Sequence, residues 1–229
     1  MSRKAVVLLS GGLDSSTVLY MARADGYRTF CLIFDYGQRH RKEIKSAQVI
    51  ARKARSAYKV VKFNLPWKGS SLLDRKMAVP RASVGAGGKQ KIPSTYVPAR
   101  NTIFISFGLS CAEAIGATTV FIGANSLDYS GYPDCRPGYY RAFGRLASLA
   151  TKRGVEGEEI SIATPLLRKT KLEILRQALS LGVPLEMTWS CYKGNRRPCG
   201  VCDSCLLREK AFSRLKIRDP LFAGKISEA

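Results

Sequence analysis

The sequence predicts an α/β fold with a doubly wound parallel sheet and a small C-terminal lobe. Short apolar runs of strand length alternate along the chain with segments of helical periodicity, which is the pattern of successive βαβ units. A glycine-rich turn joins the first apolar run to the first helical segment, at the position where such folds bind phosphate groups. Four closely spaced cysteines near the C-terminus indicate a compact metal-binding lobe.

The spacing of apolar residues predicts each element. Thr170 and Glu173 form a capping box before one helical segment, and Gly182 ends it. In chain order, we expect strands at 5–9, 29–34, 58–63, 119–123 and 159–164, and helices at 14–22, 43–55, 103–115, 139–152 and 170–181.

The chain divides into two predicted parts. Residues 1–185 contain the alternating strands and helices, and residues 186–229 contain the cysteine lobe and a C-terminal helix or tail. Residues 64–94 interrupt the alternation and are rich in proline, glycine and serine. Long loops in compact domains are often lids, so we expect a mobile surface loop here.

The composition indicates a basic protein. Its 229 residues include 38 Lys and Arg against 17 Asp and Glu, a net charge of +21. This excess suits a polyanionic ligand, nucleic acid or an acidic partner, and it also fits adaptation to unusual intracellular conditions. No apolar run reaches the roughly 18 residues of a membrane span. Seven cysteines without a signal peptide favour reduced thiols or a metal, and therefore the cytoplasm.

The turn at residues 10–16, which reads SGGLDSS, is the strongest predicted site. Its glycines allow close backbone approach, its free N–H groups and serine hydroxyls donate, and the following helix dipole favours an anion. It lacks the lysine of a Walker A loop, so it suits the diphosphate that leaves when an α-phosphate is attacked. The segment resembles the signature of the ATP-pyrophosphatase (PP-loop) superfamily.

Four cysteines form the predicted metal site. Pairs of thiolates two residues apart can bind one ion, and four thiolates satisfy tetrahedral zinc. Ferredoxin-type iron–sulfur sites share part of this spacing and remain an alternative to zinc. The predicted ligands are Cys191, Cys199, Cys202 and Cys205.

The remaining reactive side chains have a simpler interpretation. Cys31, Cys111 and Cys135 are expected to pack in the interior. His40 is the only histidine, and we expect it on the surface at a helix start. A triad hydrolase or a histidine metal site would depend on this residue alone, so the sequence favours neither function.

Several stretches together resemble the 7-cyano-7-deazaguanine synthase family of the queuosine pathway. They are the loop at 10–16 and the segments 34–40, 96–101, 125–137, 151–157 and 188–205, in matching order. The resemblance implies an adenine nucleotide alpha hydrolase-like, Rossmann-like fold. The basic excess and the segment near 85–91 depart from the family pattern.

The resemblance implies conversion of 7-carboxy-7-deazaguanine and ammonia to the nitrile, with release of AMP and diphosphate. Adenylation makes the carboxylate reactive, ammonia displaces AMP to give an amide, and a second adenylation removes the remaining oxygen. It also implies a homodimer, one structural Zn²⁺, and Mg²⁺ bound with ATP. No glutaminase segment is visible, so ammonia is expected to arrive free.

The resemblance also implies roles for individual residues. Asp14 would assist Mg²⁺, and Arg100, Lys152 and Arg153 would neutralise the α-phosphate and the substrate carboxylate. Asp128 or Asp134 would accept from the guanine-like edge, with Tyr129 or Tyr132 stacking on the ring. The expected ATP-binding residues are Leu9, Ser10, Gly11, Gly12, Leu13, Asp14, Ser15, Ser16, Thr17, Val18 and Leu19.

Three other functions are considered from the sequence. One is a superfamily relative that adenylates the C-terminal carboxylate of a protein, and the match in the loop at 125–137 argues against it. The charge would suit a PP-loop enzyme that modifies tRNA directly, and contact with nucleic acid is possible without being required. The basic cysteine lobe would suit a nucleic-acid binder without enzymatic activity.

Overall fold

A five-stranded parallel sheet forms the centre of the computed structural model, which describes residues 3–81, 92–127 and 132–222. The strand order is β3-β2-β1-β4-β5, and every adjacent pair is parallel. The strands are β1 (Lys4–Leu8), β2 (Arg28–Asp35), β3 (Ala57–Lys62), β4 (Thr119–Ile122) and β5 (Ser161–Ala163).

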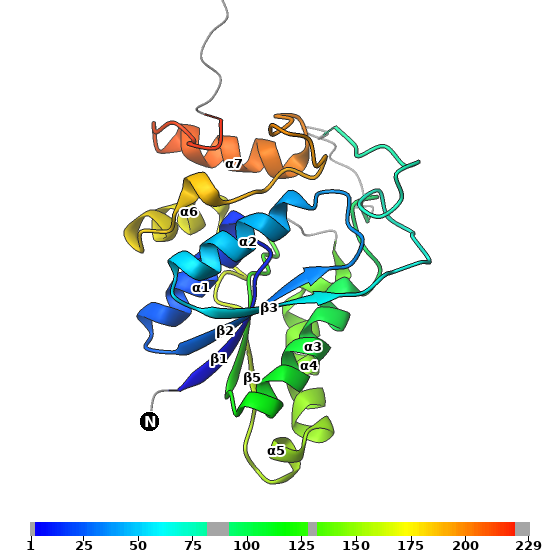
Figure 1. The fold of residues 1–229 in the computed structure, drawn as a ribbon, viewed down its shortest axis with the longest axis vertical. Coiled ribbons are helices and arrows are strands. Elements are labelled where there is room, and N and C mark those ends of the chain that lie inside the picture. Colours follow the sequence, from blue (N-terminus) through cyan, green and yellow to red (C-terminus); the bar gives the residue numbers. More distant parts are fainter. Residues whose placement is uncertain (1–2, 82–91, 128–131, 223–229) are drawn as a thin grey trace, which may run out of the picture.

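Helices cover both faces of this sheet, so the predicted fold class is confirmed (Figure 1). Alternate residues of β1 face opposite cores: Ala5 and Val7 pack in one cluster, Val6 and Leu8 in the other. One face carries α1 (Leu13–Ala24), α2 (Lys42–Lys53), α6 (Lys171–Ser180) and α7 (Asp203–Arg214), and the other carries α3 (Arg100–Ile115) and α4 (Pro137–Ala150), which α5 (Lys152–Val155) follows.

The strand order places a topological switch point beside β1. The chain runs outward from β1 through β2 to β3, then returns to build β4 and β5 on the other side of β1. Ligands of open parallel sheets bind in the crevice at the carboxyl ends of the strands at such a point. The loop that follows β1 therefore lies where this fold binds ligands.

Helix α3 begins three residues earlier than expected. Its first residue is Arg100, after Ala99 in the left-handed conformation (φ 51°). The backbone N–H of Asn101 donates to Oδ2 of Asp134 at 3.1 Å. This cap comes from a segment over thirty positions away in the chain, so the local sequence contains no signal for it.

The described parts of the predicted loop at 64–94 are packed. Leu65 and Leu72 belong to the core under α3, and Ser70 and Ser71 both donate to the carbonyl of Ser94. Residues 82–91, where the glycine-rich stretch lies, are outside the described residues. The prediction of mobility at their position is untested.

The cysteine lobe shares the main core. Ala211 and Phe212 of α7 belong to the same buried cluster as Val18 and Leu19 of α1. None of the helices within the described ranges has the length and apolar character needed to cross a membrane.

The close packing of α3 on the sheet gives a stability prediction. A Cβ atom at Gly108 would lie 2.8 Å from Cγ1 of Val120 and 3.0 Å from Cδ2 of Leu8, both in the buried core. Gly108→Val should therefore lower the free energy of unfolding by about 1–3 kcal/mol through overpacking.

Gly144→Val is the matched control, because nothing lies within 4 Å of a Cβ at that helical position. It should change stability by only a few tenths of a kcal/mol, roughly the difference in helix propensity. Urea unfolding of both variants measures the two values, and equal stabilities would contradict the packing described for α3.

Candidate active site

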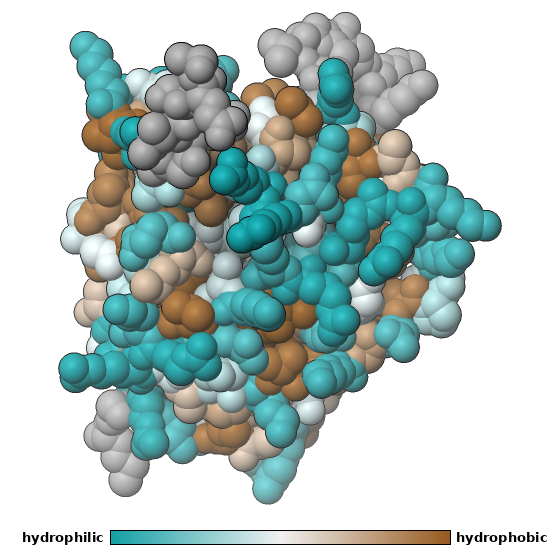
Figure 2. Space-filling model, turned by 45° about the horizontal axis from the view of Figure 1, so that its top comes forward, coloured by the Kyte–Doolittle hydropathy of each residue, from teal (hydrophilic) through white to brown (hydrophobic). Residues whose placement is uncertain are grey.

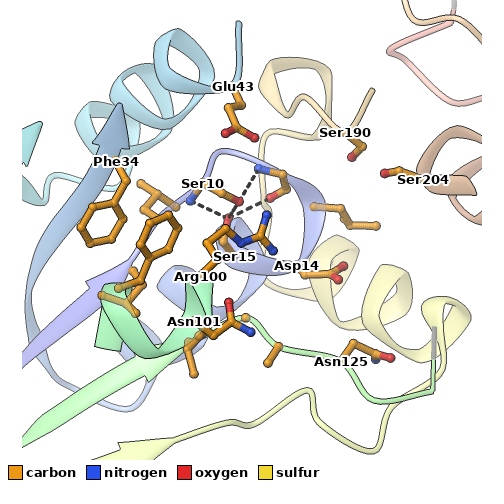
Figure 3. A pocket seen from close by; sticks show the side chains of 18 of the residues that line it. Ser10, Asp14, Ser15, Phe34, Glu43, Arg100, Asn101, Asn125, Ser190 and Ser204 are labelled. Atoms are coloured by element: carbon orange, nitrogen blue, oxygen red, sulfur yellow. Dashed lines mark hydrogen bonds between the residues drawn. The ribbon is translucent and has the colours of Figure 1, made fainter. Parts of the chain in front are cut away.

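One pocket opens at the switch point, with walls from both halves of the chain (Figure 3). The carboxyl ends of β1, β2 and β4 form its floor, and the first turns of α1 and α3 point toward it. One side of the pocket is completed by the residues that flank Cys191 in the chain, Trp189, Ser190 and Tyr192. Hydrophilic side chains cover much of the molecular face drawn in Figure 2.

The loop after β1 is held in one conformation by backbone packing. Gly11 has φ +80°, and a Cβ there would lie 2.5 Å from both the Ala47 nitrogen and the Glu43 carbonyl oxygen. The N–H of Trp189 donates to the Gly11 carbonyl at 2.8 Å. Only glycine combines this dihedral angle with this approach, so the loop is set between α2 and the cysteine lobe.

The serines of the loop divide into two groups. Ser10 and Ser15 line the pocket, and their hydroxyls lie 3.0 Å apart. The hydroxyl of Ser16 donates to the Gly12 carbonyl at 2.7 Å, and Thr17 donates likewise to Leu13. Ser16, Thr17, Val18 and Leu19, which also belong to the predicted ATP-binding set, are buried in α1, do not line the pocket, and support the loop from behind.

Asp14 lies in the pocket and is paired with a lysine that the sequence analysis did not identify. Nζ of Lys171 lies 2.8 Å from both carboxylate oxygens of Asp14, and both side chains are largely buried. Lys171 is the first residue of α6, directly after the Thr170 cap. The confirmed capping box placed the start of this helix, but only the packing of α6 on α1 brings Lys171 to the loop.

Arg100 lies on the opposite wall, at the start of α3. Burial opposes its charge, but Tyr36, Tyr132 and Asp134 together raise the pKa of the guanidinium above its usual range. Burial likewise raises the pKa of Tyr36 to about 12, so this phenol stays neutral beside the cation. Arg100 is thus a fixed positive charge facing the loop at residues 10–16, called the phosphate loop below (Figure 3).

The predicted substrate residues have different positions. Tyr132 is buried, lines the pocket and shares a 2.7 Å hydrogen bond with Thr95. Asp134 is buried as the cap of α3 and does not line the pocket, which argues against its predicted contact with a ligand edge. Asp128 and Tyr129 lie outside the described residues.

Lys152 and Arg153, for which a catalytic role is expected from the sequence, are not among the residues that line this pocket. Both follow α4 at the amino-terminal edge of the sheet (Figure 1). Arg153 contacts Glu158 at 2.8 Å and the carbonyl of Ala117, which precedes β4. Because the pocket lies at the other end of the strands, these two residues cannot reach it from within the same chain.

His40 is buried, contrary to the expected surface position. Its Nε2 lies 3.0 Å from Oε2 of Glu43, a carboxylate that lines the pocket. Cys135 also lines the pocket, and burial raises the pKa of its thiol to about 11. A thiol protonated at neutral pH fits the packing role expected for it.

The four C-terminal cysteines converge as predicted. The Sγ atoms of Cys191, Cys199, Cys202 and Cys205 all lie within 4.8 Å of one another. Hydrogen bonds from Cys202 and Cys205 lower the pKa of the Cys191 thiol, and the Cys199 N–H donates to its sulfur at 3.3 Å. This set of soft, close donors fits a single tetrahedrally bound metal ion.

A buried arginine connects this cluster with the pocket wall. Arg208 of α7 donates to both carboxylate oxygens of Asp219 and to Oγ1 of Thr188 at 2.6 Å. Thr188 precedes Trp189, the residue bonded to Gly11. The cysteine lobe is therefore joined to the phosphate loop through a short, buried path.

Comparison with known proteins agrees with this site. Residues 4–216 match the family model described as queuosine biosynthesis protein QueC. A 7-cyano-7-deazaguanine synthase from Nostoc punctiforme is 55% identical over 220 residues, which cover 95% of this chain and 98% of that protein. One from Anaeromyxobacter sp. is 52% identical over 222 residues, with 96% and 95% coverage.

Among solved structures, a predicted tRNA methyltransferase subunit from Methanocaldococcus jannaschii matches with a TM-score of 0.50 and 16% identity, over 77% of this chain and 74% of that one. This likeness concerns the fold alone. The sequence matches extend over nearly the whole length of both partners and include the phosphate loop and the cysteines. The chain therefore belongs to the QueC family, the 7-cyano-7-deazaguanine synthases of queuosine biosynthesis, which are ATP-dependent ligases.

Proposed function

We propose that the pocket binds ATP with its phosphates on the loop at 10–15 and holds 7-carboxy-7-deazaguanine beside Arg100. The observation that carries this assignment is the position of Arg100 across the pocket from a phosphate loop without a lysine of its own. A cation there lies where charge builds up as the α-phosphate is attacked. The loop N–H groups and the hydroxyls of Ser10 and Ser15 would hold the departing diphosphate.

The chemistry follows from the two oxygens that must be removed. The substrate carboxylate attacks the α-phosphate, and the diphosphate leaves on the side of the loop. Ammonia then displaces AMP to give the amide, and adenylation of the amide oxygen allows loss of a second AMP to leave the nitrile. Arg100 would stabilise the carboxylate and the phosphoryl oxygens in both adenylations.

Asp14 and Lys171 are the charged pair nearest to the expected phosphates. Asp14 is the carboxylate placed to hold Mg²⁺, and Lys171 is the cation placed to contact phosphate oxygens. Bound Mg²⁺ would supply charge neutralisation on the triphosphate. In the absence of a nucleotide, each side chain neutralises the other.

The ring of the substrate needs an apolar wall and a polar edge. Phe34 and Phe104 stack with ring centroids 4.0 Å apart, and both line the pocket. Tyr132 remains a candidate for stacking, and Asp128 and Tyr129 remain proposals for residues outside the described ranges. Because Asp134 caps α3, it would act by positioning Arg100 and Asn101.

We assign zinc to the four-cysteine site. Tetrahedral Zn–S bonds of about 2.3 Å separate the sulfurs by about 3.8 Å, and Sγ atoms of Cys199 and Cys205 lie 4.0 Å apart. A four-iron cluster needs a wider arrangement, because each thiolate binds a different iron. The ion would have a structural role, because the four cysteine ligands fill its tetrahedral coordination and leave no open position for water or substrate.

Other parts of the proposal depend on the family. A homodimer, free ammonia as nitrogen source and a cytoplasmic location remain predictions. The net charge of +21 is the single observation that favours the tRNA-modifying alternative, but family membership supports a free deazapurine acid as substrate. The nucleic-acid binder without activity loses its support for the same reason.

The reaction can be tested directly. Incubation of the protein with ATP, Mg²⁺, ammonium and 7-carboxy-7-deazaguanine should produce AMP and the nitrile in a ratio near two, because each removed oxygen leaves with one AMP. Chromatography and mass spectrometry measure both products. Formation of ADP, or activity only when tRNA is added, would contradict the proposal.

Asp14→Asn should lower kcat/KM for ATP by about 100-fold, because it removes the charge beside the phosphates. Asp25→Asn is the matched control: Asp25 is the C-cap of the same helix, α1, at the end away from the pocket. Steady-state AMP release measures both variants. Equal activities would remove Asp14 from the site.

Cys202→Ser should abolish binding of one zinc per chain and lower the thermal midpoint, since a structural metal contributes directly to folding. Cys111→Ser is the control, because Cys111 is a partly buried cysteine of α3 outside the cluster. Elemental analysis gives the metal content, and differential scanning calorimetry gives the midpoint. Iron and sulfide in place of zinc would show that the assignment is wrong.

A further inference from the structure

A second carboxylate lines the pocket, and neither the phosphate loop nor the cysteine site accounts for it. Glu43, in the first turn of α2, points into the pocket from the side of the phosphate loop (Figure 3). Its backbone carbonyl is one of the two atoms that exclude a Cβ at Gly11. The carboxylate is therefore fixed relative to the loop that would hold the phosphates.

Two buried side chains orient this carboxylate. Nε2 of Gln38 donates to Oε1 of Glu43 at 2.9 Å, and Nε2 of His40 lies 3.0 Å from Oε2. Gln38 is in turn held by the Phe34 carbonyl and the Tyr36 N–H. Each oxygen of Glu43 thus has one buried donor, which leaves further lone pairs for a ligand in the pocket.

Neither donor to Glu43 is a lysine or an arginine. Gln38 has no charge, and Nδ1 of His40 is buried with no hydrogen-bond partner among the described residues, so only Nε2 of His40 is engaged. Across the described ranges, no lysine or arginine forms an ion pair with Glu43. Asp14 differs, because Lys171 already neutralises it. Glu43 is thus a negative charge that a cationic or proton-donating ligand could satisfy.

Glu43 faces the proposed carboxylate site from the side of the loop after β1, since both Glu43 and Arg100 line the pocket. Tyr36 forms a hydrogen bond with the guanidinium of Arg100 and also interacts with the charge of Glu43. A nitrogen that attacks an acyl carbon held by Arg100 would therefore approach from the side of Glu43. The side chain of Glu43 is 15% exposed, so a proton taken there can pass on to water.

We propose that Glu43 is the general base for the amine substrate, and that Gln38 and His40 are its positioning residues. This inference rests on the proposed function. The carboxylate would bind ammonium and take the proton that converts it to ammonia, then pass that proton to water. Ammonia attacks the acyl carbon, Glu43 receives the second proton that nitrogen loses as the C–N bond forms, and the C–O bond to AMP breaks with AMP leaving with that electron pair. After the second adenylation, Glu43 would accept the two nitrogen protons one after the other, each passing on to water, as the second AMP leaves and the C≡N bond forms.

Two half-reactions separate this role from nucleotide binding. Exchange of labelled diphosphate into ATP, dependent on the deazapurine acid and measured without ammonium, reports adenylation alone. Nitrile formation in the presence of ammonium reports all steps. Glu43→Gln keeps the size of the side chain but removes the base, so it should leave exchange unchanged and slow nitrile formation by at least about 100-fold.

Two further variants complete the test. Glu209→Gln, on the exposed side of α7, removes the same charge from another helix and should leave both rates unchanged. Glu43→Asp, which retains a carboxylate, should recover part of the nitrile-forming activity. Circular dichroism and thermal unfolding verify that each variant is folded.

The outcomes are distinguishable. If Glu43→Gln loses exchange and nitrile formation to the same extent, the residue binds ATP or the acid and the inference is wrong. If the variant forms nitrile at the normal rate, the inference is also overturned. If the unsubstituted protein shows no exchange at all, the proposed adenylation itself fails, independently of Glu43.

Discussion

The close approach of three chain segments at Gly11 is the constraint on which the rest of the site depends. The left-handed glycine lets α2 pack against the loop after β1 with no room for a Cβ, and its carbonyl accepts from Trp189. A loop of this kind would be mobile if it were exposed on its own. Here it is held between a helix and the cysteine lobe, so its N–H groups are oriented before any ligand arrives.

This constraint gives the cysteine lobe a part in the pocket besides its own folding. The buried side chain of Arg208, in α7, donates to Asp219 and to Thr188. Trp189, which follows Thr188 in the chain, donates to the Gly11 carbonyl. Removing one partner of such a buried, charged network is costly, because the remaining charge stays desolvated. The position of the loop is thus coupled to the position of the lobe, and the four-cysteine cluster lies at the start of α7.

The charges around the pocket are arranged in advance of the chemistry. Arg100 is kept cationic by Tyr36, Tyr132 and Asp134, Asp14 is matched by Lys171, and Glu43 is held by Gln38 and His40. Fixed charges in a partly buried site need little reorganisation during the reaction, which is the main source of electrostatic catalysis. Asp14 and Glu43 are carboxylates in different environments of one pocket, which suits the two different tasks proposed for them, Mg²⁺ binding and proton transfer.

The sequence by itself determined the sheet and helix alternation, the phosphate loop and the cysteine cluster, because each depends on local spacing of apolar residues, glycines or thiols. Tertiary structure alone decided which distant side chains share the pocket. Lys171 reaches Asp14 through the packing of α6 on α1, Asp134 caps α3 from another segment, and Lys152 and Arg153 lie at the far edge of the sheet. The burial of His40 is likewise a result of tertiary packing. Contacts between segments that are distant in the chain decide which polar groups face one another, and the local spacing of residues does not predict these contacts.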